Sequence, residues 1–272
     1  LRQSLAALAD DAKQTWIRKL LLYRFDHGKG LEGHNLGNLI LTALQDMAGS
    51  TPKALEIAES IFKLKGKIYP ITTTNVQLVI EYEDGTFLIG EDHLNPGNSG
   101  GKAIKQIRLS PNADLYDKAR ESIINADVIV IGPGDLYASI LPNFVVSGFQ
   151  DALNQSRAKT VYVVNLMTSF TQTSGYKASQ HVNEIIRYAH KQPDFVLLNN
   201  GAIAQEILKK YESENEYPVE DDVNSDHGYA VIRDNFVSLV TPEKQAGDAL
   251  HRTLLRHNEE KLTELIIQIA HK

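Results

Sequence analysis

Hydrophobic residues in the first third of the chain recur every three or four positions, which is the spacing of one face of a helix. Residues 1–22 show this spacing from the first residue onwards, residues 36–47 show it again, and a third run begins at Thr51-Pro52. We expect Thr51 to cap the third helix, proline to occupy its first position, and Gly66 to end it in a left-handed conformation. This part of the chain is therefore predicted to be helical, with a glycine-rich turn at 26–35.

The spacing then changes to the alternation that is typical of strands. Apolar and polar side chains alternate over 74–82, Asp84-Gly85 is a turn signal, and residues 86–90 form the second strand of a hairpin. A loop rich in glycine and asparagine at 95–101 leads to a further strand at 104–109.

Beyond residue 115, short apolar strands alternate with amphipathic helices, which is the pattern of a parallel sheet. We expect strands at 127–131, 161–165, 195–199, 229–232 and 236–240, and helices at 115–125, 142–153, 179–189 with Ser179 as its cap, 202–211, and at the end of the chain with Leu262, Leu265, Ile266 and Ile269 on one face. The predicted class is α/β: a Rossmann-like, doubly wound, mostly parallel sheet flanked by helices. We predict one domain that spans 1–272 and carries a hairpin-containing insertion at about 67–110.

Composition limits the kind of protein. The 272 residues are 42% hydrophobic and 23% charged, as in soluble globular proteins, and they include no cysteine, so no disulfide, thiolate zinc site or iron–sulfur cluster can form. No apolar stretch approaches the roughly 20 residues of a membrane span, and the opening residues lack the features of a signal peptide. A net charge of -6 argues against a nucleic-acid groove but allows a local anion pocket. We expect a cytoplasmic protein with no nucleic-acid or membrane partner.

Two glycine motifs match known sequence patterns, but the elements predicted beside them are not those that the patterns require. Gly28, Gly30 and Gly33 spell the dinucleotide fingerprint, but a helix precedes them and no acidic residue follows on a next strand. Residues 97–101 spell the nucleophile elbow around Ser99, but they join two antiparallel strands. We read the first motif as a turn and the second as a flexible loop.

The loop at 132–139 stands in a better context, because it follows a buried parallel strand and precedes a helix. Ligands of such sheets bind beyond the carboxyl ends of the strands, where glycines let backbone N–H groups approach a phosphate. The loop favours a phosphate or nucleotide site, because it combines Gly132 and Gly134 with the Ser139 hydroxyl and a Tyr137 ring that could stack on a base. A plain turn is the alternative.

Polar residues elsewhere have two readings each. Asn165, Met167 and Thr168 follow one strand and Asn199 and Asn200 follow the next, although asparagine is also a common turn former. Asn35 can cap a helix or join an anion site. His34 and His181 can each take one of these two roles, or can act as a general acid or base. No two histidines have a metal-ligand spacing, and the acidic run at 212–226 is better read as a solvated loop than as a cation site.

Four segments taken together resemble one family. Residues 23–25 (YRF), 33–39 (GHNLGNL), 132–143 (GPGDLYASILPN) and 165–168 (NLMT) are similar to the superfamily of 2-phospho-L-lactate transferase and the bacterial gluconeogenesis factor, and the third segment resembles the gluconeogenesis-factor branch. The resemblance runs in order along essentially the whole chain. Members open with a strand and a glycine-rich phosphate turn, so we expect that the chain begins after that region.

The resemblance implies a ligand and a set of binding residues. In the gluconeogenesis-factor branch it implies a cytoplasmic regulator of carbon use, cell-wall synthesis and cell shape that binds UDP-N-acetylglucosamine. In the transferase branch it implies transfer of a phospholactyl group from a guanosine diphosphate donor with magnesium. The binding residues that it implies here are Gly33, His34, Asn35, Gly37, Asn38, Gly132, Pro133, Gly134, Asp135, Leu136, Tyr137, Ser139, Asn165, Met167, Thr168 and Asn199.

Two departures from the family pattern favour binding over metal-assisted transfer. Thr171-Gln172 stands where relatives have a glycine–glutamate pair, and Gln180 replaces an aspartate before His181. The leading hypothesis is a nucleotide-sugar-binding regulator without turnover and without a required cofactor. A magnesium-dependent transferase and a scaffold for protein partners are the alternatives. The expected partner is a phosphorylated small molecule or nucleotide sugar, and a homodimer is the assembly to test.

Overall fold

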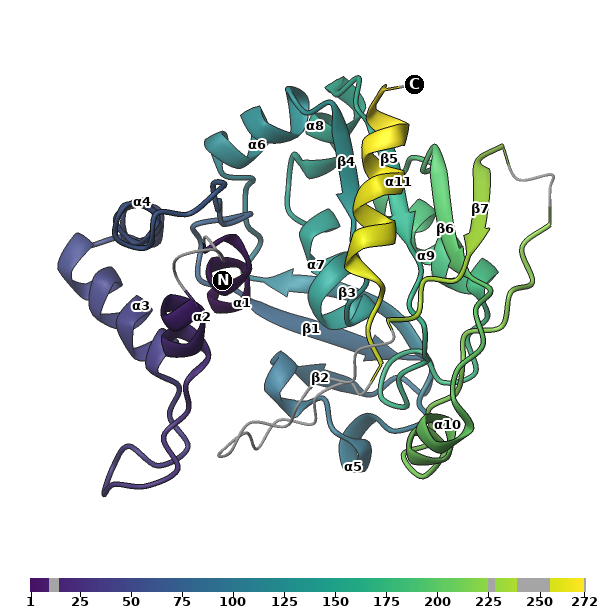
Figure 1. The fold of residues 1–272 in the computed structure, drawn as a ribbon, viewed down its shortest axis with the longest axis horizontal. Helices are drawn as coiled ribbons and strands as arrows, with labels where there is room; N and C mark the ends of the chain where they lie inside the picture. The colour runs from purple at the N-terminus through teal and green to yellow at the C-terminus, as the bar shows by residue number, and fades with distance from the viewer. Residues whose placement is uncertain (10–14, 225–227, 239–254, 272) are drawn as a thin grey trace. The chain divides into compact units, whose positions relative to one another are not determined.

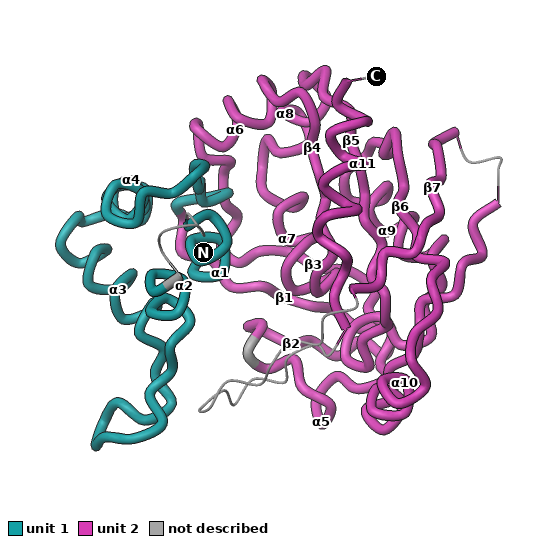
Figure 2. The backbone as a smooth tube through the Cα atoms, in the orientation of Figure 1, with its two compact units in different colours: residues 1–73, 243–252 teal, residues 74–242, 253–272 magenta. Residues whose placement is uncertain are grey.

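The backbone divides into two compact units (Figure 2). The computed structural model describes residues 1–9, 15–224, 228–238 and 255–271. One unit comprises residues 1–73 and 243–252, and the other comprises 74–242 and 253–272. The sequence predicts a single domain. The division into two compact units does not test that prediction, which remains open.

The described part of the first unit is mainly helical, as expected. Its helices are α1 (Arg2–Leu8), α2 (Thr15–Leu22), α3 (Leu36–Ala48) and α4 (Thr51–Phe62), and they enclose a core that includes Leu5, Leu21, Leu44 and Leu55. The continuous helix expected over 1–22 is wrong, because Ala9 adopts an extended conformation with ψ 136° and ends α1. Residues 10–14 lie outside the described part of the chain.

Helix α4 lies where it was expected, but its ends differ from the prediction. Ser50, not Thr51, is the N-cap, so Pro52 occupies the second helical position. The left-handed residue at the C-terminal end is Lys63, with φ 48°, and not Gly66. A side chain at Gly66 would instead press against Leu8, at 3.3 Å, so glycine is explained there by close packing.

The predicted hairpin is confirmed as part of an antiparallel sheet. Strands β1 (Gln77–Tyr82), β2 (Phe87–Ile89) and β3 (Ile104–Ser110) have the order β2-β1-β3. After β2 come the short 3-10 helix η1 (Glu91–His93) and one helical turn, α5 (Pro96–Ser99), in place of the expected flexible loop. Ser99 is buried and its hydroxyl donates to Asn95 O at 2.9 Å, which excludes the nucleophile reading.

The second half of the chain forms the predicted parallel sheet. Strands β4 (Val128–Ile131), β5 (Lys159–Val163), β6 (Phe195–Asn199) and β7 (Ala230–Asp234) are parallel and stand in the order β4-β5-β6-β7. The α/β class is therefore confirmed. On its outer edge β4 pairs with no strand of the described residues, and Val130 is 42% exposed.

Helices flank this sheet (Figure 1). Val161 and Val163 of β5 face α11 (Glu259–His271) and pack in one cluster with Ile269, and α11 crosses in front of the sheet in the view. Helix α9 (Ala178–Ala189) lies behind it. The remaining helices are α6 (Asp117–Ile124), the π-helical turn η2 (Leu136–Ile140), α7 (Leu141–Phe144), α8 (Phe149–Gln155) and α10 (Gln205–Glu212).

Three of the expected boundaries need correction. The helix expected at 142–153 is divided into α7 and α8, because Gly148 has a positive φ of 82° between them. Helix α9 begins after Lys177, so Ser179 is not its cap. The strand expected at 236–240 is not formed over 236–238, where Val237 makes only an isolated bridge with His257, and 239–240 lie outside the described residues.

Candidate functional site

The loops that follow β4 and β5 meet at one edge of the parallel sheet. Residues 132–135 follow β4 and residues 165–168 follow β5, and the carboxyl ends of parallel strands lie at the same edge. Asn165 Nδ2 donates to Gly134 O at 2.9 Å and so joins the two loops. The structure thus brings together two of the four segments that the sequence singled out.

A pocket of about 540 Å³ opens at this edge. Pro133, Gly134 and Asp135 line it from the first loop, and residues 165–169 line it from the second. Its remaining walls were not expected. They come from Tyr211, Glu216, Leu255, Arg256, His257, Glu259 and Leu262.

The glycines of the first loop are not required by the fold. Neither Gly132 nor Gly134 has a positive φ. A Cβ would meet nothing within 4 Å at Gly132, and only Ile140, at 3.7 Å, at Gly134. A ligand that lies directly on this backbone would explain glycine at both positions.

Gln172 fixes the turn that follows these glycines. Its Oε1 accepts hydrogen bonds from Tyr137 N at 3.0 Å and Ala138 N at 3.1 Å, so these two N–H groups face the protein and not a phosphate. The side chain also bonds to Asp135: removal of that carboxyl from water raises its pKa, and the bond to Gln172 opposes the rise. In the sequence, Gln172 stands out only as an amide at a position where the family resemblance implies a carboxylate.

The expected stacking role of Tyr137 is wrong. Leu136 and Tyr137 are buried, and the Tyr137 hydroxyl bonds to the Tyr176 hydroxyl at 2.8 Å. No face of this ring is left for a base. Ser139 is exposed, and its N–H donates to Asp135 O at 2.8 Å within the turn.

Arg256 gives the larger pocket a positive charge beside the carboxylates of Asp135, Glu216 and Glu259, and His257 adds an acid–base group. Arg256 is exposed, and its guanidinium has neither an ion pair nor a hydrogen bond among the described residues. His257 Nε2 lies 3.1 Å from Val164 O, so this nitrogen carries the hydrogen and Nδ1 is left as an acceptor. Burial lowers the pKa of His257, and the bond to Val164 opposes this change. Neither residue belongs to a motif, and only the polar tripeptide at 256–258 before the last helix could have signalled them.

A second pocket of about 220 Å³ lies between the ends of β5 and β6. It shares Asn165 and Leu166 with the larger pocket, so the two pockets adjoin the same segment. Asn199, Asn200 and Asp221 are the polar side chains on its other walls.

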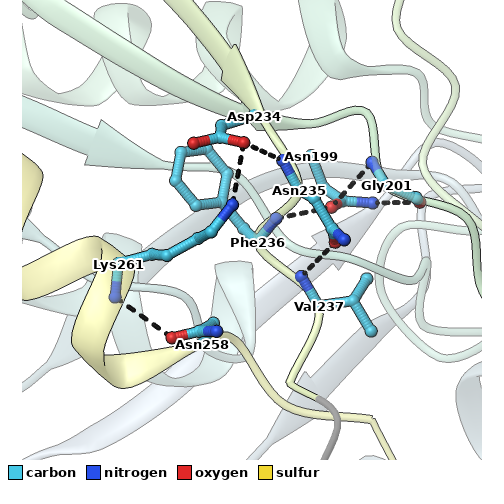
Figure 3. A network of polar contacts seen from close by, with 8 residues as sticks. All are labelled: Asn199, Gly201, Asp234, Asn235, Phe236, Val237, Asn258 and Lys261. Atoms are coloured by element: carbon cyan, nitrogen blue, oxygen red, sulfur yellow. Dashed lines mark hydrogen bonds and ion pairs between the residues drawn. The ribbon is translucent and has the colours of Figure 1, made fainter.

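Asn199 serves this pocket as a structural clip. Its Oδ1 accepts from Gly201 N at 3.1 Å and from Phe236 N at 2.9 Å, and its Nδ2 donates to Gly201 O at 2.9 Å (Figure 3). Both ends of the amide are therefore occupied. The network continues to Asp234, which accepts from Lys261 Nζ at 3.0 Å.

The segment 165–168 is also tied down. Thr168 Oγ1 accepts from Tyr217 N at 2.9 Å, and Thr168 N donates to Tyr217 O at 2.7 Å. Met167 lines the larger pocket with a side chain that is 9% exposed. The ligand contacts expected of these residues stay predictions.

The predicted binding residues at 33–38 belong to the first unit. Asn35 is the N-cap of α3: its Oδ1 accepts from Asn38 N at 3.0 Å and its Nδ2 donates to Tyr23 O at 2.8 Å. A Cβ at Gly37 would lie 2.3 Å from Leu21 O, so this glycine permits close packing of helices. Gly33 has φ 80° and His34 is exposed. Their part in binding, and the acid or base role of His34, stay predictions.

His181 and the acidic run have structural surroundings. His181 is buried in α9, neither ring nitrogen has a hydrogen-bond partner within the described residues, and burial lowers its pKa to about 4. In the acidic run, Glu220 pairs with Lys177 and Asp221 with Arg233, while Asp222 accepts from Ser179. Within the described ranges no three histidine or acidic side chains gather into a set that could hold a metal ion. In the same ranges no helix has the length and apolar character to cross a bilayer.

A family model, curated relatives and a solved structure all match most of this chain, and they point to related proteins. The model of the family described as 2-phospho-L-lactate transferase CofD matches residues 1–237. A Thermotoga maritima protein provisionally named a gluconeogenesis factor is 37% identical over 99% of this chain and 82% of its own length. The Bacillus subtilis gluconeogenesis factor is 33% identical over 99% of this chain and 81% of its own length. A crystal structure of a UPF0052 family member from Bacillus halodurans has a TM-score of 0.84 and 34% identity, and the match covers 98% of this chain and 81% of that one.

Proposed function

The chain belongs to the CofD family, and within that family we propose that it is a nucleotide-sugar-binding regulator of the gluconeogenesis-factor type, with UDP-N-acetylglucosamine as the ligand class. We place it in the cytoplasm, where it would sense this ligand and act on carbon metabolism, cell-wall synthesis and cell shape.

One observation carries the proposal: an arginine whose guanidinium has no partner among the described residues lines a pocket whose glycines the fold does not need. Arg256 supplies the permanent positive charge that a diphosphate requires. Gly132 and Gly134 allow the diphosphate to approach the backbone beside it. The apolar walls, which include Leu255 and Leu262, suit a flat base.

Calorimetric titration of the purified protein with UDP-N-acetylglucosamine tests the proposal. We expect binding to the wild type, and for Arg256→Ala an affinity weaker by about tenfold to a hundredfold, because hydrogen bonds to charged groups contribute about 1.5–3 kcal/mol. Arg157→Ala is the matched control. Arg157 is exposed with no partner among the described residues, but it precedes β5 and so lies at the opposite end of that strand from the pocket. Equal affinities of the two variants would contradict the assignment of Arg256.

A magnesium-dependent phospholactyl transferase is the second candidate, and the family match together with the acceptor nitrogen of His257 favours it. Magnesium at nucleotide sites is held by one or two carboxylates together with phosphate oxygens, so Asp135 of the larger pocket could contribute one ligand. Formation of a phospholactylated deazaflavin from a guanosine diphosphate donor, dependent on magnesium, would establish this activity. Binding of UDP-N-acetylglucosamine with no such product would support the regulator.

A further inference from the structure

The smaller pocket differs from the larger one in its chemistry. None of its lining residues is lysine, arginine or histidine. Its charged side chain is Asp221, whose carboxylate is held by Arg233 at 2.5 and 3.1 Å, and this pairing keeps the pKa of Asp221 low. An ionised carboxylate with no lining cation disfavours a phosphate.

The lining suits an uncharged ring that bears hydroxyl groups. Leu198, Ile203 and Val219 supply an apolar surface, and Asn200 supplies an exposed amide that has no hydrogen bond from its side chain within the described residues. Sugar rings combine an apolar face with hydroxyl groups at the rim. The volume of about 220 Å³ lies below the roughly 300 Å³ at which pockets for drug-sized ligands begin, so it suits one ring and not a whole nucleotide.

We propose that the smaller pocket binds the sugar of the nucleotide sugar while the larger pocket binds its diphosphate and base. Asn165 and Leu166 line both pockets, so a ligand with its phosphates at Arg256 crosses this segment to place its sugar beside Asn200. This orientation rests on the proposed function and adds to it a site that selects the sugar.

The test compares UDP-N-acetylglucosamine with UDP, which lacks the sugar. Asn200→Ala removes one neutral hydrogen-bonding group, so we expect a loss of about twofold to tenfold in affinity for the nucleotide sugar and unchanged affinity for UDP. Ile203→Trp fills the pocket, and we expect a loss greater than about tenfold for the nucleotide sugar alone. Asn154→Ala, at an exposed asparagine of α8 with no partner among the described residues, is the matched control and should change neither affinity.

The outcomes separate this inference from the proposed function. If both ligands bind the wild type and Arg256→Ala weakens both, while neither pocket variant discriminates between them, the sugar does not occupy the smaller pocket. If Asn200→Ala and Ile203→Trp weaken UDP as much as the nucleotide sugar, the pocket holds another part of the ligand and the orientation is overturned. If the wild type binds neither ligand, the proposed function itself fails. Circular dichroism of each variant confirms that it is folded.

Discussion

Gln172 illustrates how one uncharged side chain sets the electrostatics of a loop. Its oxygen holds two consecutive N–H groups, and its amide reaches Asp135 at the edge of the larger pocket. A glutamate could accept the same two N–H groups, but it would place a second carboxyl beside Asp135. The amide therefore adds no further carboxylate to a pocket that Asp135, Glu216 and Glu259 already line.

Gln172→Glu should weaken UDP binding at pH 7.5 by about tenfold or more, because like charges near a surface at about 4 Å repel by several kcal/mol. Neighbouring carboxyls raise one another's pKa, so part of the loss should be regained as the pH falls and the pair takes up a proton. Titrations of wild type and variant at pH 7.5 and 5.5 measure this. A penalty that is the same at both pH values would mean that the variant acts by distorting the loop and not by its charge.

His181 should make the fold sensitive to acid. Its pKa is lowered to about 4 by burial, against about 6.5 in an unfolded chain, so between these values the unfolded state binds more protons. The free energy of unfolding should therefore fall as the pH drops from about 6.5 to about 4, by on the order of 3 kcal/mol. Urea unfolding at several pH values should show a smaller fall for His181→Leu, while His190→Asn, at an exposed histidine, should retain the slope of the wild type.

At the scale of the elements, the ends of β6 and β7 depend on one amide. Asn199 accepts from two backbone N–H groups, of Gly201 and Phe236, and a methyl group cannot replace it. We expect Asn199→Ala to lower the free energy of unfolding by about 2 kcal/mol or more, because each unsatisfied buried donor costs about 1–3 kcal/mol. Chemical denaturation checks the value, with Asn200→Ala at the exposed neighbouring position as the control. If the free energy of unfolding falls by the same amount in both variants, the hydrogen bonds of the Asn199 amide make no specific contribution to stability.

The elements themselves could be predicted from periodicity, and their ends could not. The hairpin, β6 and α3 lie where the pattern of apolar residues places them. The end of α4 was missed because Lys63 takes up the left-handed conformation that glycine would adopt more readily. The break between α7 and α8 was missed because Gly148 resembles an ordinary helical glycine until its φ is known.

At the scale of the whole molecule, topology explains which parts of the site could be predicted. Parallel strands bring residues 132–135 and 165–168 to one edge, so the sequence pattern was sufficient to pair them. Arg256 and His257 reach the same pocket from the far end of the chain, and no periodicity or spacing encodes a contact of that range. Tyr137 was misread because its position in the motif does not reveal that it points into the core.

The outer edge of β4 has a consequence for association between molecules. On that side its backbone groups pair with no strand of the described residues, so beside the half-exposed Val130 they can accept a further strand, from this protein or from a second copy. Two copies related by a twofold axis at this edge would run their β4 strands antiparallel and share one continuous eight-stranded sheet. Self-association would then depend on concentration and on the hydrogen-bonding capacity of four residues rather than on any large apolar surface.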